Sequence, residues 1–179
     1  MSSRHSQAGS PSPADSSSPL QPERQISWTV KIFASGLFTG YSPIASGTVA
    51  SALATAIYFI PGFEHPFSII PASFLTFILG AKAAGIMEER FGHDPAEVTI
   101  DEVLGMWISL MFLPKSVGIA ILAFLVFRAL DIVKPWPARK FDSIPGGLGI
   151  MLDDVVAGFY TNLLMHLAIR LDLPTLLPF

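Results

Sequence analysis

Two pairs of neighbouring acids stand directly before apolar stretches of this sequence. Asp101-Glu102 precedes one such stretch, and Asp153-Asp154 precedes another that is rich in small residues. A helix N-terminus favours acidic side chains through the helix dipole, so one pair alone predicts only a helix start. Two pairs beside apolar residues, where an unpaired carboxylate is costly to bury, indicate a functional site instead. Carboxylate oxygens are the ligands that Mg²⁺ prefers, so we expect divalent-cation chemistry.

Basic side chains that could neutralise a phosphate follow a third apolar stretch. Arg128 and Asp131 are spaced i, i+3 and therefore share one face of a helix. Lys134 comes just before two prolines that stop the helix. The simpler interpretation is a surface ion pair with a basic last turn. If this face meets Asp101-Glu102, however, Arg128 and Lys134 lie where phosphate oxygens would bind.

Hydroxyl side chains near the start of another apolar run offer a second way to bind an anion. Thr48 and Ser51 follow Gly47, where we predict a helix start with free backbone N–H groups. Serine and threonine cap helices throughout proteins, so this pattern alone has little specificity. Asp94, in a polar loop, is a further candidate.

Uncharged runs supply the elements that must position these side chains. A short break at Pro114-Lys115 between two runs forces an antiparallel hairpin, which brings Asp101-Glu102 beside Arg128 and Asp131. Counting crossings from this hairpin places the other polar ends, including Lys82 and Asp153-Asp154, on the same face. The predicted apolar helices are Thr48 to Ile60, Pro66 to Ala81, Val103 to Leu113, Ser116 to Phe127 and Val155 to Ile169.

Composition favours a bilayer as the surroundings of these helices. Hydrophobic residues make up 51% and charged residues 14% of the chain, whereas charged residues form about a quarter of an average soluble protein. Each run is shorter than the roughly 20 residues that cross a bilayer, so a soluble helical domain is the alternative. We expect an all-α fold, a compact bundle of short apolar helices, in a polytopic membrane protein. Most Lys and Arg residues accompany the acids, which predicts that the acidic face is cytoplasmic.

Composition also excludes several classes of function. The net charge of −3 and the lack of a basic run predict no nucleic-acid partner. The absence of cysteine excludes a phosphocysteine mechanism. Residues 1–25 are rich in Ser and Pro and are predicted to form a disordered tail, which leaves residues 26–179 as a single domain.

Four segments resemble the signature segments of the phosphatidylglycerophosphatase A family, in the same order and spacing. They are SPIASGTVAS, TIDEVLGMWISL, FRALDIVKPWPARKFD and GGLGIMLDDVVAG, and the resemblance spans about Gly36 to Ile169. It implies an all-helical fold, Mg²⁺ dependence and hydrolysis of phosphatidylglycerophosphate to phosphatidylglycerol and phosphate at a bacterial inner membrane. The polar residues that match the family's motifs are Thr48, Ser51, Asp94, Asp101, Glu102, Arg128, Asp131, Lys134, Asp142, Asp153 and Asp154.

The resemblance and the residue types together predict a mechanism. One or two Mg²⁺ ions would activate a water that attacks the phosphorus, although direct attack by an aspartate is an alternative. Cationic side chains would neutralise charge in the transition state. The expected metal ligands are Asp101, Glu102, Asp131, Asp153 and Asp154. The expected catalytic residues are Asp101, Glu102, Asp131 and Asp154, and the expected phosphate ligands are Thr48, Ser51, Arg128 and Lys134, with Asp94 and Asp142 as further candidates.

Other functions fit parts of the same pattern. A phospholipid-synthesising alcohol phosphotransferase also clusters aspartates at a membrane surface, but its spaced aspartate motif on a single helix is absent from the sequence. A divalent-cation transporter would carry acids within its apolar runs, whereas these acids flank the runs. A third alternative keeps the family and changes the substrate to another lipid phosphate. The sequence predicts no particular oligomeric state.

Overall fold

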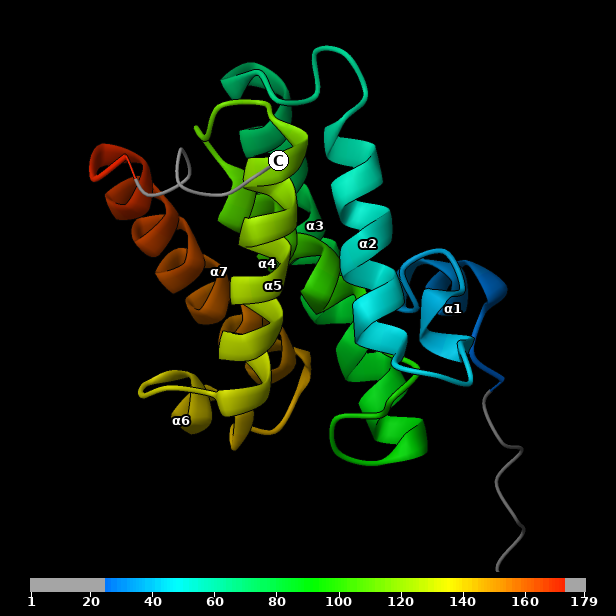
Figure 1. Ribbon diagram of the computed structural model, residues 1–179. Coiled ribbons are helices and arrows are strands. Elements are labelled where there is room, and N and C mark those ends of the chain that lie inside the picture. Colours follow the sequence, from blue (N-terminus) through cyan, green and yellow to red (C-terminus); the bar gives the residue numbers. More distant parts are fainter. Residues whose placement is uncertain (1–24, 173–179) are drawn as a thin grey trace, which may run out of the picture.

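The computed structural model describes residues 25–172, and it contains only helices, turns and loops in that part of the chain. The all-α prediction is confirmed, whereas the tail predicted over residues 1–25 lies almost entirely outside the described residues. Figure 1 shows the elements. They are α1 (Trp28–Ala34), η1 (Thr39–Tyr41), α2 (Ser46–Tyr58), α3 (Pro66–Phe91), α4 (Ile100–Leu110), α5 (Val117–Val133), α6 (Ala138–Asp142) and α7 (Gly147–Arg170).

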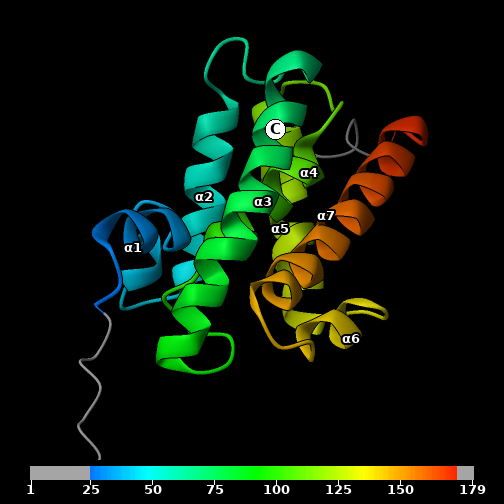
Figure 2. The same ribbon diagram turned by 180° about the vertical axis from the view of Figure 1, so that it is seen from behind.

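Helix α4 forms the centre of the bundle. Every residue of α4 except Glu102 is buried, and α2, α3, α5 and α7 pack around it. Helix α1 packs against α3, and η1 packs against α2. The two views of the ribbon show this N-terminal part on one side of the bundle and α6 beneath the start of α7 (Figures 1 and 2). A short, fully surrounded helix of this kind can place its first turn deep inside the molecule.

The hairpin that the sequence predicted around Pro114-Lys115 is present. Helix α5 runs back alongside α4, and the two helices contact one another. At the connecting end, the Lys115 ammonium donates a hydrogen bond of 2.7 Å to Glu64 Oε2 and one of 3.2 Å to Ile60 O. The opposite end of the hairpin therefore holds the start of α4 and the end of α5.

Two helices extend further than their uncharged runs. Helix α3 continues past Lys82 to Phe91 and stops at Gly92, whose φ of 97° is left-handed. Helix α7 begins at Gly147, so Asp153 and Asp154 lie about two turns into the helix. The sequence had placed them at its start. Charge proved a poor marker of helix ends because a charged side chain leaves the backbone hydrogen bonds of the helix intact.

The greater length of these two helices bears on whether the chain can span a membrane. Helices α3 and α7 have 26 and 24 residues and are long and apolar enough to cross a bilayer. The expectation that every run falls short of a bilayer is therefore wrong for these two. Core helices of soluble proteins can reach the same length and composition, so this finding on its own does not place the chain in a membrane.

Helices α4 and α7 approach one another at two glycines. A Cβ on Gly158 would lie 2.5 Å from the Gly105 carbonyl oxygen, and a Cβ on Gly105 would lie 2.9 Å from the Asp154 carbonyl oxygen. Small residues allow backbones to approach this closely. Because Gly105 comes one turn after Glu102, and Gly158 one turn after Asp154, this crossing brings the two acidic pairs together.

Candidate active site

An acidic cavity of about 220 Å³ lies where α2, α4 and α7 begin and α5 ends. This is the lower end of the molecule in Figure 1. The structure thus gathers at one place most of the polar ends that the crossing argument assigned to one face, although Thr48, Lys82 and Arg128 are not among the lining residues. The side chains that line the cavity include Ser46, Asp94, Asp101, Glu102, Asp131, Lys134, Asp153 and Asp154.

Three carboxylates at the base of this cavity form a compact set of oxygen ligands. One oxygen from each of Asp101, Glu102 and Asp154 lies within 4.8 Å of the other two. Asp101 is only 8% and Asp154 only 2% exposed. Asp101 Oδ1, Glu102 Oε2 and Asp154 Oδ2 are buried and have no hydrogen-bond partner among the described residues. Buried carboxylate oxygens that lack donors fit a hard divalent cation, so this cluster could bind a metal ion.

The acids at the start of α4 are held in an environment that opposes their ionisation. Burial, followed by the neighbouring Glu102, raises the pKa of Asp101 well above its usual range. Burial also raises the pKa of Glu102 to about 8, with Asp154 and Asp131 adding to the effect while Asp101 and Arg128 lower it. A bound cation would reverse these preferences by stabilising the charged forms, so metal binding should release protons.

Two basic side chains stand beside the carboxylates. Arg128 Nη1 lies 2.6 Å from Asp131 Oδ2, yet Nη1 and Nε make no directed hydrogen bond to any described residue. This pair is therefore a close ion pair with N–H groups left to donate. Lys134 Nζ donates to Asp153 Oδ2 at 2.7 Å, and Asp153 Oδ1 accepts from the Asp154 backbone N–H at 2.9 Å. Asp153 thus already has donors at both oxygens, unlike Asp154 Oδ2.

The start of α2 contributes to the site through residues other than the two predicted hydroxyls. Ser46 lines the cavity. A Cβ on Gly47 would contact Glu102 Oε1 and lie 3.0 Å from Arg128 Nη1, so this position has no room for a side chain. Thr48 and Ser51 do not line the cavity, and the Ser51 hydroxyl donates to the Gly47 carbonyl at 2.8 Å. Their role in binding phosphate stays a prediction.

Glu88 supports the site from α3, a role that sequence reasoning missed. Its Oε2 accepts from the Gly146 backbone N–H at 2.6 Å, just before α7 begins. Its Oε1 lies 2.6 Å from His93 Nδ1. Glu88 therefore connects the end of α3 to the loop that carries Asp94 and to the start of α7. In the sequence, Glu88 stands next to Glu89 and Arg90, and this local pattern does not indicate either contact.

Asp94 and Asp142 are the two further candidates for the site. Asp94 is exposed on a loop, lines the cavity and has a left-handed φ of 47°. Asp142 ends helix α6, but its side chain lies outside the described part of the structure. A role for either residue stays a prediction.

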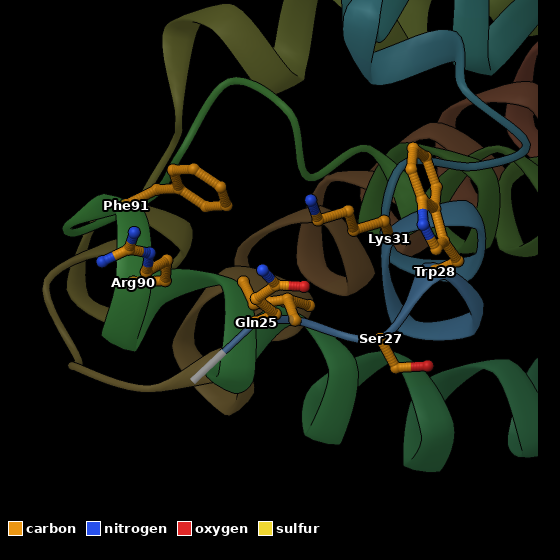
Figure 3. Close-up of a pocket in the computed structure, with 7 residues that line it drawn as sticks. Gln25, Ser27, Trp28, Lys31, Arg90 and Phe91 are labelled. Carbon is orange, nitrogen blue, oxygen red and sulfur yellow. The ribbon is translucent and has the colours of Figure 1, made fainter. Parts of the chain in front are cut away.

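A second cavity of about 660 Å³ lies between the N-terminal segment and the end of α3. Figure 3 shows Arg90 and Phe91 on one side and Trp28 and Lys31 on the other. Among the described residues, no carboxylate side chain lines this cavity. It therefore lacks the oxygen ligands that make the smaller cavity suitable for metal-assisted chemistry.

Comparison with known proteins identifies the family. The sequence profile described as phosphatidylglycerophosphatase A matches residues 32–169, which include every acid of the cavity. The chain belongs to the phosphatidylglycerophosphatase A family. The resemblance seen in the sequence is thereby confirmed, and family membership makes the chain a phosphoric monoester hydrolase.

Relatives of this phosphatidylglycerophosphatase A family member come from several bacteria. Phosphatidylglycerophosphatase A of Escherichia coli is 38% identical over 132 residues, covering 71% of this chain and 76% of the relative. The Haemophilus influenzae protein of the same name is 40% identical over 89 residues, covering 48% and 55%. A Bacteroides thetaiotaomicron protein, named as a candidate phosphatidylinositol-3-phosphatase, is 36% identical over 145 residues, covering 76% and 91%. No solved structure matches the chain.

Proposed function

We propose that this chain hydrolyses phosphatidylglycerophosphate to phosphatidylglycerol and inorganic phosphate, that it depends on Mg²⁺, and that the acidic cavity is its active site. One observation carries the proposal: three carboxylates, each with a buried oxygen that lacks a donor among the described residues, converge beside Lys134 and the ion pair of Arg128 with Asp131. In a family of phosphatidylglycerophosphatases, such a set combines cation ligands with groups that bind phosphate.

The carboxylates divide into ligands and positioning groups. Asp101, Glu102 and Asp154 would hold Mg²⁺, since one oxygen from each of them lies within 4.8 Å of the other two. When bound, Mg²⁺ supplies charge that stabilises the phosphate and lowers the pKa of a water molecule. Asp131 and Asp153 then orient the two basic side chains, because each pairs with one of them.

The basic residues bind the phosphoryl group. Phosphoryl transfer spreads negative charge over the phosphate oxygens, so it is accelerated mainly by positioning and by cationic groups. Arg128 has buried N–H groups that lack hydrogen-bond partners among the described residues, and these can donate to phosphate oxygens. Lys134 lines the cavity and supplies a second positive charge.

The surface of the bundle supports a location in the bacterial inner membrane. The apolar windows of α3 and α7 are only 33% and 50% buried inside the protein, less than expected for core helices of a soluble domain. Large apolar side chains such as Phe67, Phe74 and Leu163 are exposed along these helices. Burying them in lipid removes this surface from water. The excess of basic residues at the acidic end then orients the active site toward the cytoplasm.

The direct test is phosphate release by the purified full chain in detergent. Phosphatidylglycerophosphate is supplied with Mg²⁺, and again with excess EDTA. The proposal predicts release that stops in EDTA and returns when Mg²⁺ is added back. Release that continues unchanged in EDTA would contradict the metal-dependent mechanism, and no release from folded protein would contradict the substrate.

A second candidate function keeps the chemistry and changes the headgroup. The Bacteroides thetaiotaomicron relative is named for a phosphoinositide substrate, and the alignment covers 91% of that protein. Phosphatidylinositol 3-phosphate should therefore be assayed beside phosphatidylglycerophosphate under identical conditions. A higher kcat/KM for the phosphoinositide would assign this second substrate.

A further inference from the structure

An apolar cavity of about 190 Å³ lies between α1 with the turn that follows it, α2, α3 and α4. Its walls include Leu37, Leu53, Ile57, Ile100 and Trp107. Thr76 carries the only hydroxyl among the side chains that line it. Cavities without polar partners do not hold ordered water well and favour hydrocarbon groups.

Two of the helices that line the acidic cavity, α2 and α4, also line the apolar cavity. Ile100 lines the apolar cavity, and the next residue, Asp101, lines the acidic one. From there α4 carries the apolar wall two turns further, to Trp107. Helix α2 follows the same order, because Ser46 in its first turn lines the acidic cavity whereas Leu53 lies on the apolar wall. The apolar cavity thus leads away from the acids and toward the interior of the proposed membrane region.

A strained turn shapes the outer edge of the apolar cavity. Leu37 and Phe38 adopt left-handed φ angles of 58° and 70°, which are unfavourable for large side chains. The turn is held in place because the Phe38 backbone N–H donates to Ser35 Oγ at 3.0 Å. It is also tied to the start of α4, where the Thr99 backbone N–H donates to Ala34 O at 2.9 Å.

The strained turn connects the cavity to an apolar surface. Leu37 is 62% exposed and lines the cavity, and Phe38 is exposed beside it. Hydrocarbon at the surface of the protein can therefore reach the cavity without crossing a polar rim at this point. This connection distinguishes it from the cavity of Figure 3, whose lining includes two basic side chains.

We propose that the apolar cavity binds part of an acyl chain of the phospholipid substrate while its terminal phosphate lies in the acidic cavity. The proposal rests on the lipid substrate proposed above. It explains why neighbouring residues of α4 line cavities of opposite character, since the substrate has a charged headgroup and a hydrocarbon tail. Binding energy from this remote part of the substrate would help to hold the phosphate in place.

A fluorescence experiment tests occupancy without requiring turnover. The sequence contains three tryptophans. Replacing Trp28 and Trp136 by Phe leaves Trp107, which is only 8% exposed, as the single emitter. We expect phosphatidylglycerol with brominated acyl chains to quench Trp107, because bromine quenches on contact. Adding Leu53→Phe, which fills the cavity, should abolish the quenching. Leu163→Phe, on the exposed face of α7, is the matched control and should leave it unchanged.

Enzyme kinetics test whether the hydrocarbon that occupies the apolar cavity belongs to the substrate. Leu53→Phe should raise KM for a long-chain phosphatidylglycerophosphate about tenfold, as expected when about two methylenes lose their apolar site. The KM for a short-chain analogue and the kcat for both substrates should stay unchanged, as should all values for Leu163→Phe. Equal losses with both substrates would indicate a structural defect and overturn the proposal.

The outcomes separate this proposal from the proposed function. Absence of quenching by brominated chains would overturn the acyl-chain site whether or not the enzyme releases phosphate. Quenching with unchanged long-chain KM in Leu53→Phe would assign the cavity to a bystander lipid, which also overturns the proposal. No phosphate release by the wild-type chain would contradict the proposed function, while quenching would still report whether hydrocarbon enters the cavity.

Discussion

The two ends of α4 differ in whether their polar groups have hydrogen-bond partners. At its end, the Ser109 hydroxyl donates to Gly105 O at 2.8 Å, and the Asn162 amide donates to Ser109 O at 3.2 Å and Met111 O at 2.7 Å. At its start, Asp101 and Glu102 each keep a buried oxygen that has no donor among residues 25–172. Folding alone favours the first arrangement, because an unsatisfied buried group costs free energy.

The end of α4 with satisfied hydrogen bonds stabilises the bundle, whereas the acidic end is the candidate for its chemistry. Repulsion among buried carboxylates persists only when the surrounding structure holds them in place. Here the crossing of Gly105 with Gly158 does so, since it fixes α4 against α7. Substitutions at the acidic end should therefore change activity more than stability, and substitutions at the opposite end should do the reverse.

The largest effect is expected from Asp154→Asn. The change removes one ligand charge, and we expect kcat to fall about 10³-fold, in line with the loss of a group that stabilises a transition state electrostatically. The melting temperature in EDTA should stay the same or rise, because one source of repulsion is gone. Phosphate release and thermal unfolding of the same preparation measure both. Lower stability together with normal activity would contradict the view that the acidic end of the bundle serves activity more than stability.

The second prediction concerns the crossing that joins the two acidic pairs. A Cβ in Gly158→Ala would lie 2.5 Å from the Gly105 carbonyl oxygen and must separate α4 from α7. We expect a loss of about 1–3 kcal/mol of stability through overpacking, together with reduced Mg²⁺ affinity. Gly85→Ala is the control, because the nearest atom to its Cβ is 3.4 Å away and alanine favours a helix. If both variants kept normal Mg²⁺ affinity, the crossing would not position the acids.

The third prediction is a dependence of metal binding on pH. Because burial raises the pKa of Glu102 to about 8, a proton must leave before the carboxylate can bind a cation at lower pH. Mg²⁺ affinity should rise up to about tenfold per pH unit below that value if one proton is displaced. Calorimetry in buffers of different ionisation enthalpy would show the proton release. Affinity and heat that do not change with pH or buffer would contradict it.

The same pKa shift fixes the sign of the stability change in EDTA. The folded state binds more protons than the unfolded state between pH 4.5, the ordinary pKa of a glutamate, and about pH 8. Stability should therefore fall as pH rises through this interval. Thermal unfolding in detergent at several pH values measures this slope, and saturating Mg²⁺ should reduce it.

The sequence anticipated the site better than the extent of its helices. The hairpin at Pro114-Lys115 was enough to place Asp101-Glu102 near Arg128, because its topology leaves little choice. The end of α3 was misplaced because Lys82 was read as a boundary, although α3 continues to Phe91. Helix length depends on backbone hydrogen bonds and on packing, which a count of charged residues does not measure.

The residues that support the site were harder to find from the sequence. Glu88 stands beside another acid and an arginine and looks like part of a solvated turn, yet its oxygens contact Gly146 and His93 across distant segments. Gly47 reads as a common residue near a helix start, and only the structure shows that Glu102 fills the space of its missing side chain. Contacts between segments far apart in the chain leave no local pattern.

The smallest effect on catalysis is expected at the opposite end of α4. In Asn162→Leu, the carbonyls of Ser109 and Met111 lose their donors. Leaving these partly buried acceptors without a donor should cost about 1 kcal/mol of stability, the lower end of the range for buried groups. The kcat of the folded fraction should stay within about twofold of wild type, since the packing at Gly105 and Gly158 remains in place to hold the acids. Asn162→His, which keeps a donor, should recover part of the stability, and thermal unfolding with phosphate release measures both quantities. A large fall in kcat without a fall in stability would show that the two ends of α4 are not separable, and that the chemistry depends on the whole helix.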